Sequence, residues 1–134
     1  MIIDSNVFRH HKSILNQILN APNSNFRIYE IEADEGNKNL LETGRLFSWL
    51  ADGKAERSDV VIAIGGGVTG DISGFVSSTY VRGLKFIQVP TTLLSMVDAS
   101  IGGKVAIDLD QGKNLVGSFH QPEMVILDTF FLTT

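Results

Sequence analysis

The feature that most limits how this chain can fold is a strongly apolar run, residues 60–64, followed at once by a glycine-rich segment, residues 65–71. An unbroken and mostly β-branched run is typical of a central strand that is covered on both faces. Glycines directly after such a strand let the main chain approach a ligand or a neighbouring element closely. Together the two features predict an α/β fold with a buried, mostly parallel sheet.

Further strands and helices are expected to alternate along the chain. Apolar segments that suit short strands occur at residues 2–3, 26–31, 86–89, 105–107 and 125–127. Helical spacing of apolar residues lies between them, over about residues 5–19, 40–52, 72–80 and 92–97. Residues 1–134 are therefore interpreted as one Rossmann-like layered domain, and the segments around the two Gly-Lys pairs, 103–104 and 112–113, as loops.

Composition argues against several classes of function. The chain has no cysteine, and its 11 Lys and Arg against 15 Asp and Glu give a net charge of −4. A disulfide framework, a thiolate metal site and a cysteine nucleophile are therefore excluded, and general attraction to nucleic acid or to an anionic membrane is disfavoured. No apolar run approaches the roughly 20 residues of a membrane span. The first residues become charged too early for a signal peptide, so a cytoplasmic location is expected.

The glycine-rich segment is a candidate phosphate-binding turn. Gly65, Gly67 and Gly70 fit the pattern G-x-G-x-x-G, and the helix expected after them offers its positive N-terminal end to an anion. The acidic residue that the dinucleotide fingerprint places about 20 residues later is missing, and Pro90 stands there instead. An acidic strand end near Glu35 could reach the same ligand. The alternative is a structural turn that needs glycine for positive φ, which explains one or two of the four glycines.

A second group of polar side chains lies between residues 82 and 114. It could neutralise the phosphates of a ligand through Arg82, Lys104 and Lys113, with Asn114 as a hydrogen-bond donor. Taken singly, each lysine is better explained as a solvated surface charge, whereas two Gly-Lys pairs within one loop-rich stretch favour a joint anion site. The histidines give little evidence of a functional site, because His10 and His11 are expected to be solvated and His120 is expected to lie in a loop. No histidine and carboxylate residues have the spacing of metal ligands, so no metal site is predicted in this chain.

Several short motifs follow one another in a specific order. They are residues 65–71 (GGGVTGD), 74–75 (GF), 80–83 (YVRG), 88–94 (QVPTTLL), 97–104 (VDASIGGK), 112–117 (GKNLVG) and 121–122 (QP). From about residue 65 to residue 128, the sequence closely resembles the amino-terminal, nucleotide-binding domain of the 3-dehydroquinate synthase family. The resemblance is weaker before residue 65.

The resemblance implies an activity and its cofactors. Enzymes of this family act in the shikimate pathway and convert 3-deoxy-arabino-heptulosonate 7-phosphate to 3-dehydroquinate and phosphate. They do so by transient oxidation at C5, phosphate elimination, reduction and intramolecular aldol closure, with NAD and a divalent metal, zinc or cobalt. The metal ligands of the family, one glutamate and two histidines, come from a helical carboxy-terminal domain that residues 1–134 lack, as they lack the usual opening strands. The chain alone is therefore expected to be inactive.

The resemblance also implies roles for individual residues. Contacts to NAD are expected from Asp4, Asn6, Glu35, Lys38, Gly66, Gly67, Asp71, Thr91, Thr92 and Lys113. Asp98 matches an aspartate near the substrate hydroxyls and the nicotinamide, and Lys104 and Asn114 match groups that hold the substrate phosphate. Arg82 matches an arginine that reaches the phosphate from the neighbouring subunit, which implies a homodimer. Glu35, Gly67 and Thr92 are then expected to meet at one edge of the sheet.

Three positions depart from the family pattern, since Ala99, Val105 and Asp108 stand where serine, threonine and asparagine are usual. The segment 102–104 favours 3-dehydroquinate synthases over related cyclases that make valiolone or inosose precursors. Two alternatives stay open. A metal-dependent polyol or glycerol dehydrogenase shares a Gly-Gly-Gly loop but explains neither segment 102–104 nor segment 112–114. A stand-alone nucleotide-binding module would have to bind NAD in the isolated chain.

Overall fold

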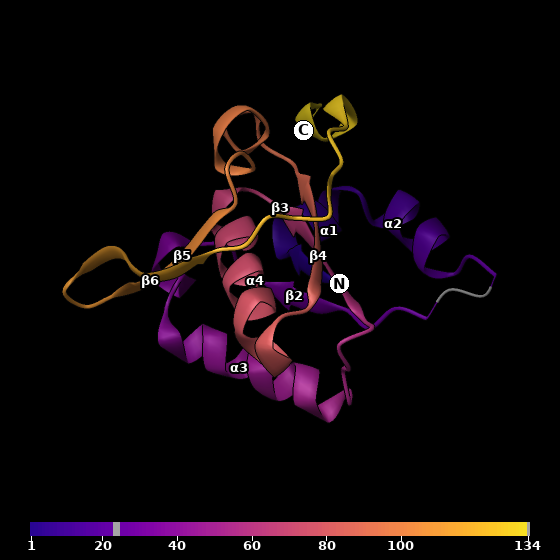
Figure 1. The fold of residues 1–134 in the computed structure, drawn as a ribbon. Coiled ribbons are helices and arrows are strands. Elements are labelled where there is room, and N and C mark those ends of the chain that lie inside the picture. The colour runs from indigo at the N-terminus through magenta and orange to yellow at the C-terminus, as the bar shows by residue number, and fades with distance from the viewer. Residues whose placement is uncertain (23–24, 134) are drawn as a thin grey trace.

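The main sheet has five parallel strands in the order β2-β1-β3-β4-β7 (Figure 1). It is described by a computed structural model that covers residues 1–22 and 25–133. The strands are β1 (Ile2–Asp4), β2 (Tyr29–Ile31), β3 (Val60–Gly65), β4 (Lys85–Pro90) and β7 (Met124–Val125). The apolar run at residues 60–64 forms the central strand, as expected, with Ala63 fully buried and Val61 and Ile64 nearly so. The expected α/β fold with a parallel sheet is confirmed.

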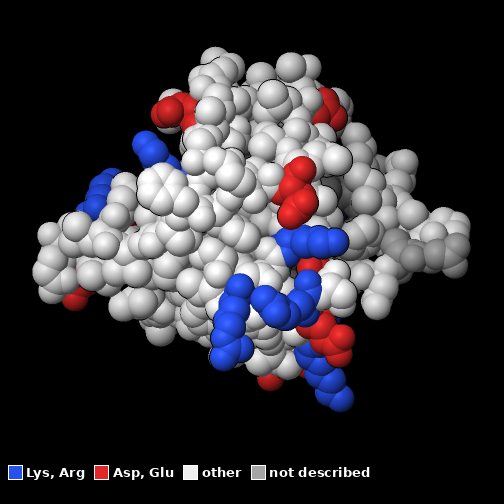
Figure 2. Space-filling model, viewed as in Figure 1, with Lys and Arg blue, Asp and Glu red and all other residues white. Residues whose placement is uncertain are grey.

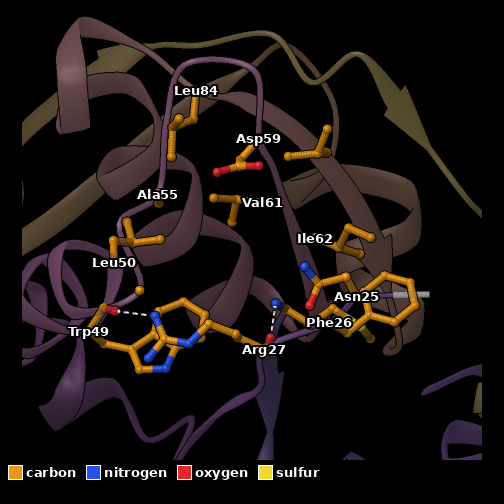
Figure 3. A pocket seen from close by; sticks show the side chains of 13 residues that line it. Asn25, Phe26, Arg27, Trp49, Leu50, Ala55, Asp59, Val61, Ile62 and Leu84 are labelled. Atoms are coloured by element: carbon orange, nitrogen blue, oxygen red, sulfur yellow. Dashed lines mark hydrogen bonds between the residues drawn. The ribbon is translucent and has the colours of Figure 1, made fainter. Parts of the chain in front are cut away.

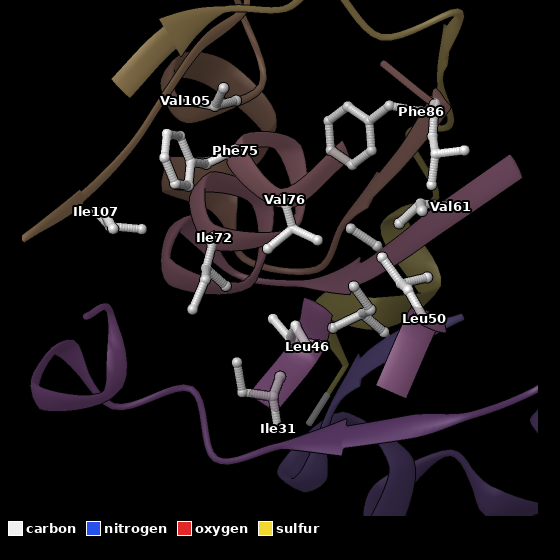
Figure 4. Close-up of a cluster of buried hydrophobic side chains, with 13 residues drawn as sticks. Ile31, Leu46, Leu50, Val61, Ile72, Phe75, Val76, Phe86, Val105 and Ile107 are labelled. Carbon is white, nitrogen blue, oxygen red and sulfur yellow. The ribbon is translucent and has the colours of Figure 1, made fainter. Parts of the chain in front are cut away.

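Two helices cover one face of the sheet, namely α3 (Leu40–Asp52) and α4 (Gly67–Thr79). Their apolar side chains meet those of the sheet in one buried cluster that contains Leu46, Ile72 and Phe86 (Figure 4). Helix α4 buries Ile72, Phe75 and Val76, and between them it carries small buried residues such as Gly74. A Cβ on Gly74 would come within 2.4 Å of Val105 Cγ1, so glycine is required there by packing.

The opposite face is covered by α1 (Ser5–His10) and α2 (Lys12–Leu19). Asp4 caps α1, since its side chain accepts a hydrogen bond from the Asn6 N–H. The sequence predicted one continuous helix here, but the helix breaks at His11. The prediction that His11 is solvated is also wrong, because its ring is buried and contacts the rings of Phe130 and Phe131, each with a centroid distance of 5.1 Å. His10 is exposed, as expected.

An antiparallel hairpin, β5 (Lys104–Leu109) and β6 (Gly112–Phe119), forms a separate two-stranded sheet that extends away from the main sheet (Figure 1). The loop predicted around residues 112–113 is therefore part of a strand. The sequence did not predict this strand because β6 is mostly exposed and so lacks an alternation of apolar and polar residues. It also contains a glycine, Gly117, at a position where a side chain would not fit. A Cβ on Gly117 would lie 2.5 Å from the carbonyl oxygen of Val105. The hairpin packs on α4, where Ser118 donates a hydrogen bond to Ser78 at 2.7 Å.

The remaining elements are short helical turns, of which three lie between strands and one follows β7. They are η1 (Glu35–Asn37), η2 (Tyr80–Arg82), the π-helical turn η3 (Ser95–Ala99) and η4 (Thr129–Leu132). The short helix expected after residue 91 is confirmed, and Thr92 begins it by accepting a hydrogen bond from the Ser95 N–H at 3.2 Å. In the described part of the chain, no helix is both long and apolar enough to cross a membrane.

Candidate functional site

The carboxyl ends of four neighbouring strands lie along one edge of the sheet. The strand register pairs Gly65 with Pro90 and Ile3 with Ile64, so the segments that follow β1, β3 and β4 leave the sheet at the same level. Glu35 follows β2 at this edge, Gly67 follows β3 and Thr92 follows β4. The expected meeting of these three segments is confirmed. Such an edge is where ligands of open parallel sheets bind.

The four glycines after β3 have two different reasons to be glycine. None of them has positive φ, so the interpretation as a positive-φ turn is wrong. A Cβ on Gly65 would lie 2.4 Å from Thr69 Oγ1, and a Cβ on Gly70 would lie 2.3 Å from Gln88 Nε2. Close packing therefore explains these two glycines.

Gly66 and Gly67 are not explained by packing within the chain. A Cβ at either position would make only ordinary contacts, at 3.4 Å from the Thr92 side chain and 3.5 Å from that of Ala99. Gly66 is the N-cap residue of α4, and no side chain caps the helix there. The N-terminus of this 13-residue helix thus has no side-chain cap, and an uncapped helix N-terminus suits the pyrophosphate of a dinucleotide.

Lys38, Asp71 and Asn114 form a polar cluster beside this helix end. The Lys38 side chain is 5% exposed, and its Nζ lies 2.5 Å from Asp71 Oδ2 and donates a hydrogen bond to Asn114 Oδ1 at 2.6 Å. Burial raises the pKa of Asp71 above its ordinary value, and the neighbouring Lys38 ammonium opposes that rise. The cluster joins three segments that are far apart in the sequence.

A second ion pair lies at the surface next to this cluster. Lys113 Nζ donates to Glu35 Oε1 at 2.9 Å, and this hydrogen bond raises the pKa of Lys113 above its ordinary value. Both side chains are exposed, so the pair contributes little to stability. Basic and acidic side chains also lie next to one another on the face seen in Figure 2. The pairing leaves both groups accessible to a ligand.

Three hollows along the carboxyl edge are lined by residues that the sequence singled out. A cavity of about 620 Å³ is lined by Asp71, Asp98, Lys104 and Asn114, together with Ala99, Ile101 and neighbouring residues of the hairpin. A second, also of about 620 Å³, is lined by Asn6 and Glu35. A smaller one of about 170 Å³ is lined by Asp4, Asn6, Thr91 and Thr92. The structure thus brings most of the predicted contact residues to one edge.

Arg82 is the predicted site residue that lies elsewhere. It is exposed in η2, between the end of α4 and the beginning of β4, which is the opposite end of the strand from Thr91. Its φ of 66° lies in the left-handed region, which non-glycine residues rarely adopt. Within one chain, Arg82 therefore does not join the other predicted residues.

Two residues that sequence reasoning gave no role belong to this region. The Asp108 carboxylate accepts a hydrogen bond from the Asn114 N–H at 2.7 Å, and the Asp108 N–H donates to the carbonyl of Lys38 at 2.7 Å. Phe131 lines the smallest hollow beside Thr91 and Thr92. No short sequence motif predicts either contact, because both depend on segments that meet only in the folded chain.

A further cavity, of about 310 Å³, opens at the amino ends of the strands (Figure 3). Its wall includes Arg27, whose guanidinium lies 5.1 Å from the centre of the Trp49 ring and donates to the Trp49 carbonyl at 2.9 Å. The guanidinium of Arg27 is thus already engaged by the protein. Across the described residues, no group of three or more His, Asp or Glu side chains is arranged to hold a metal ion.

Comparison with known families shows to which family the chain belongs. Residues 28–134 match the sequence model of the family described as 3-dehydroquinate synthase N-terminal. The chain belongs to this family. It is 45% identical over 136 residues to the 3-dehydroquinate synthase of Clostridium acetobutylicum, an alignment that covers 100% of this chain and 38% of that protein. The chain therefore spans little more than a third of such relatives.

Solved structures of sugar phosphate cyclases have the same fold. The 2-epi-5-epi-valiolone synthase of Streptomyces hygroscopicus subsp. jinggangensis, with NAD⁺ and Zn²⁺ bound, is similar with a TM-score of 0.94 and 30% identity over 99% of this chain and 37% of its own. A 2-deoxy-scyllo-inosose synthase complexed with carbaglucose-6-phosphate, NAD⁺ and Co²⁺ has a TM-score of 0.88 and 31% identity, over 98% of this chain and 36% of its own.

A dehydrogenase also shares the architecture. A probable glycerol dehydrogenase from Sinorhizobium meliloti is similar with a TM-score of 0.71 and 19% identity, over 97% of this chain and 32% of its own. At that identity the likeness concerns the fold alone. The match to the synthase family therefore favours the leading interpretation over the polyol dehydrogenase alternative.

Proposed function

We propose that this chain is the NAD-binding part of a 3-dehydroquinate synthase, which converts 3-deoxy-arabino-heptulosonate 7-phosphate to 3-dehydroquinate and phosphate. The observation that carries the proposal is the open, uncapped N-terminus of α4 at Gly66 and Gly67, at the sheet edge where Glu35 and Thr92 also lie. Relatives with this fold hold NAD⁺ and Zn²⁺ or Co²⁺. The proposed place of action is the cytoplasm.

Different residues at the sheet edge would bind different parts of the dinucleotide. The first-turn N–H groups of α4, beginning at Gly67, would hold the pyrophosphate. Carboxylate, amide, hydroxyl and ammonium groups would hold the riboses, the bases and the ends of the cofactor, from Asp4, Asn6, Glu35, Lys38, Asp71, Thr91, Thr92 and Lys113. When bound, NAD supplies reversible acceptance of a hydride.

The cavity between α4, η3 and the hairpin would hold the sugar phosphate. Lys104 and Asn114 line it and can hold phosphate by charge and by hydrogen bonding. Gly102 and Gly103 place Lys104 there, since their φ angles of 88° and 64° are those that glycine adopts readily. Asp98 on the same wall would accept the hydroxyl hydrogen of the substrate. The transient C5 ketone acidifies the neighbouring C–H, so phosphate can leave before the ketone is reduced again and the ring closes.

The complete reaction requires more than this chain. No metal-ligand cluster occurs in the described residues, and a divalent zinc or cobalt ion would be held by sequence beyond them. Side chains near the proposed substrate cavity are apolar and exposed, with Leu93 at 63%, Leu94 at 68% and Val97 at 61%. They support a covering element supplied by further polypeptide. The exposed Arg82 supports a homodimer in which it would reach the substrate phosphate of the neighbouring subunit.

A titration of the chain with NAD tests the cofactor part of the proposal. Calorimetry is expected to show weak, saturable binding by the parent and none by Gly67→Val, because the new side chain would fill the space in front of the α4 N-terminus. Gly44→Val is the matched control, since Gly44 lies on α3 with nothing within 4 Å of a Cβ. Equal heats from Gly67→Val and the parent would remove this turn from the site.

A further inference from the structure

Strand β6 is irregular where it carries two of the residues of the proposed site. The register of the hairpin shifts beside Asp108, so that this one residue of β5 stands opposite residues 113–115 of β6. Extra residues on one strand of a pair form a β-bulge, and bulges next to functional sites change the direction in which side chains point. Lys113 and Asn114, which would bind NAD and the sugar phosphate, both lie in this bulge.

The bulge brings two consecutive side chains to the same turn. Successive side chains of a regular strand point to opposite faces of the sheet. Here Lys113 Nζ donates to Glu35 Oε1 at 2.9 Å. The next residue, Asn114, accepts a hydrogen bond at Oδ1 from Lys38 Nζ at 2.6 Å. Glu35 and Lys38 belong to one turn after β2, so the bulge gathers side chains that a regular strand would separate.

The left-handed conformation of Asn114 is part of this bulge. Its φ of 56° is one that asparagine tolerates better than most residues. Its main-chain N–H donates to Asp108 Oδ1 at 2.7 Å, whereas the N–H groups of a regular ladder donate to main-chain carbonyls. Hydrogen bonds from a main-chain N–H to a carboxylate are among the strong ones in proteins. The carboxylate thus holds the backbone of Asn114 in the conformation that the bulge requires.

The main chain of Asp108 contacts the turn on the other side of the site. Its N–H donates to the carbonyl of Lys38 at 2.7 Å, and Asp108 pairs with Asn39 in a parallel bridge. Asp108 therefore joins the turn after β2 through its main chain and the bulge of β6 through its side chain. Removal of the side chain would leave the contact with the turn and release the bulge.

The charge of Asp108 opposes the binding of an anion, so charge does not explain an aspartate at this place. The hydrogen bond to Glu35 raises the pKa of Lys113, and the nearby Asp108 carboxylate raises it further. A negative charge this close to a phosphate-binding region repels the ligand. An asparagine at position 108 would offer the same kind of oxygen acceptor without the charge. An experiment can therefore separate the acceptor from the charge.

We propose that Asp108 is a positioning residue, whose carboxylate holds the bulge of β6 so that Lys113 and Asn114 reach their ligands together. The inference rests on the proposed function for the identity of those ligands. Asp108 acts through its neighbours, since within the described part of the chain it lines none of the three hollows along the carboxyl edge.

Hydrogen exchange tests the bulge without any ligand. The Asn114 N–H of the chain should exchange slowly in the parent and in Asp108→Asn, which keeps an acceptor, and at least about tenfold faster in Asp108→Ala. The matched control is Asp110→Ala, which removes an exposed carboxylate from the turn of the same hairpin and should leave the rate unchanged. Equal rates in the parent and in folded Asp108→Ala would overturn the proposal.

A second variant covers a failure of Asp108→Ala to fold. Asp108→Ala/Asn114→Gly takes its place, because glycine adopts the left-handed conformation readily. Its N–H at position 114 should still exchange faster than the N–H of Asn114→Gly alone. An equal rate in these two variants would count against the carboxylate as the acceptor that holds the bulge.

Steady-state kinetics of a full-length protein that contains this chain test the consequence for binding. Asp108→Ala should raise the KM for the sugar phosphate about tenfold, and Asp108→Asn should raise it less than about twofold. A role through charge alone predicts the same change in both variants, and a role in folding alone predicts an unchanged KM in folded variants. Either result would overturn the proposal. If the full-length parent shows no turnover, the proposed function fails, and the exchange rates of Asn114 still decide the role of Asp108.

Discussion

The ammonium of Lys38 lies 2.5 Å from the Asp71 carboxylate and connects the turn after β2 to the first part of α4. The contact is almost completely shielded from water on the lysine side. Few surface ion pairs contribute measurably to stability, whereas a buried pair becomes costly when one partner is removed. This pair therefore fixes the relative position of two segments that the proposed cofactor would bridge.

In a full-length protein that contains this chain, Lys104→Ala should weaken the binding of the sugar phosphate more than the binding of NAD. Lys104 lines the cavity of Asp98 and Asn114, and loss of one charge-assisted hydrogen bond corresponds to roughly 10- to 100-fold in affinity. Steady-state kinetics give KM for both ligands. Exposed Lys85, at the amino end of β4, provides the control variant Lys85→Ala. An unchanged KM and rate for Lys104→Ala would refute the phosphate role.

The isolated chain should release no phosphate from 3-deoxy-arabino-heptulosonate 7-phosphate, even with NAD and zinc. The physical reason is the lack of a metal-ligand cluster in the described residues. A colorimetric phosphate assay measures the outcome, with the full-length Clostridium acetobutylicum relative as the positive control. Measurable turnover by the isolated chain would contradict its interpretation as one part of a larger catalyst.

Gly74→Ala and Gly44→Ala should change stability in opposite directions. A Cβ on Gly74 would overlap Val105 Cγ1 and lie 3.1 Å from Phe86 Cε1, and such overpacking costs about 1–3 kcal/mol. Gly44 is exposed in the middle of α3 with open space around it, so alanine should add about 0.5–1 kcal/mol. Urea midpoints of both variants check the prediction. A neutral Gly74→Ala would mean that α4 lies further from the hairpin.

Stability should fall when Tyr29 ionises. Burial, followed by its hydrogen bond to Glu42 at 2.7 Å, raises the pKa of Tyr29 from 10.0 to about 12. Because the folded-state pKa is raised, this contribution to stability is complete below pH 10 and is lost as the pH rises through about 12.

Phenolate absorbance checks this titration. The chain has two tyrosines, so Tyr80→Phe leaves Tyr29 as the only phenol. Its midpoint is expected near 12 in the folded protein and near 10 in urea. The variant Tyr29→Phe should lose less stability between these pH values than the parent. A folded-state midpoint near 10 would show that the Glu42 contact does not persist.

The sequence predicted the sheet edge well because the chemistry there is local. The apolar run before Gly65 and the glycines after it mark a strand and a turn without help from distant residues. Parallel topology then brings Glu35 and Thr92 to the same edge. The expectation for Lys38 concerned an NAD contact, and that role stays a prediction.

What could not be predicted depends on long-range packing. His11 is polar and helical by pattern, but aromatic rings from the end of the chain bury it. Strand β6 shows no alternation because it lacks a buried face comparable to that of β5. The role of Asp108 follows only from a left-handed Asn114, which no residue spacing reveals.

Because the hairpin is separate from the main sheet, the distance between two groups of proposed binding residues can vary. Lys104 and Asn114 sit on β5 and β6, whereas Gly66 and Thr92 follow strands of the five-stranded sheet. The close fit of Val105 against Gly74 is one of the contacts that set the gap between the two groups, together with the hydrogen bond between Ser118 and Ser78. A change of side-chain size at position 74 or 105 could therefore alter the distance between the two groups of binding residues, while every binding residue stays the same.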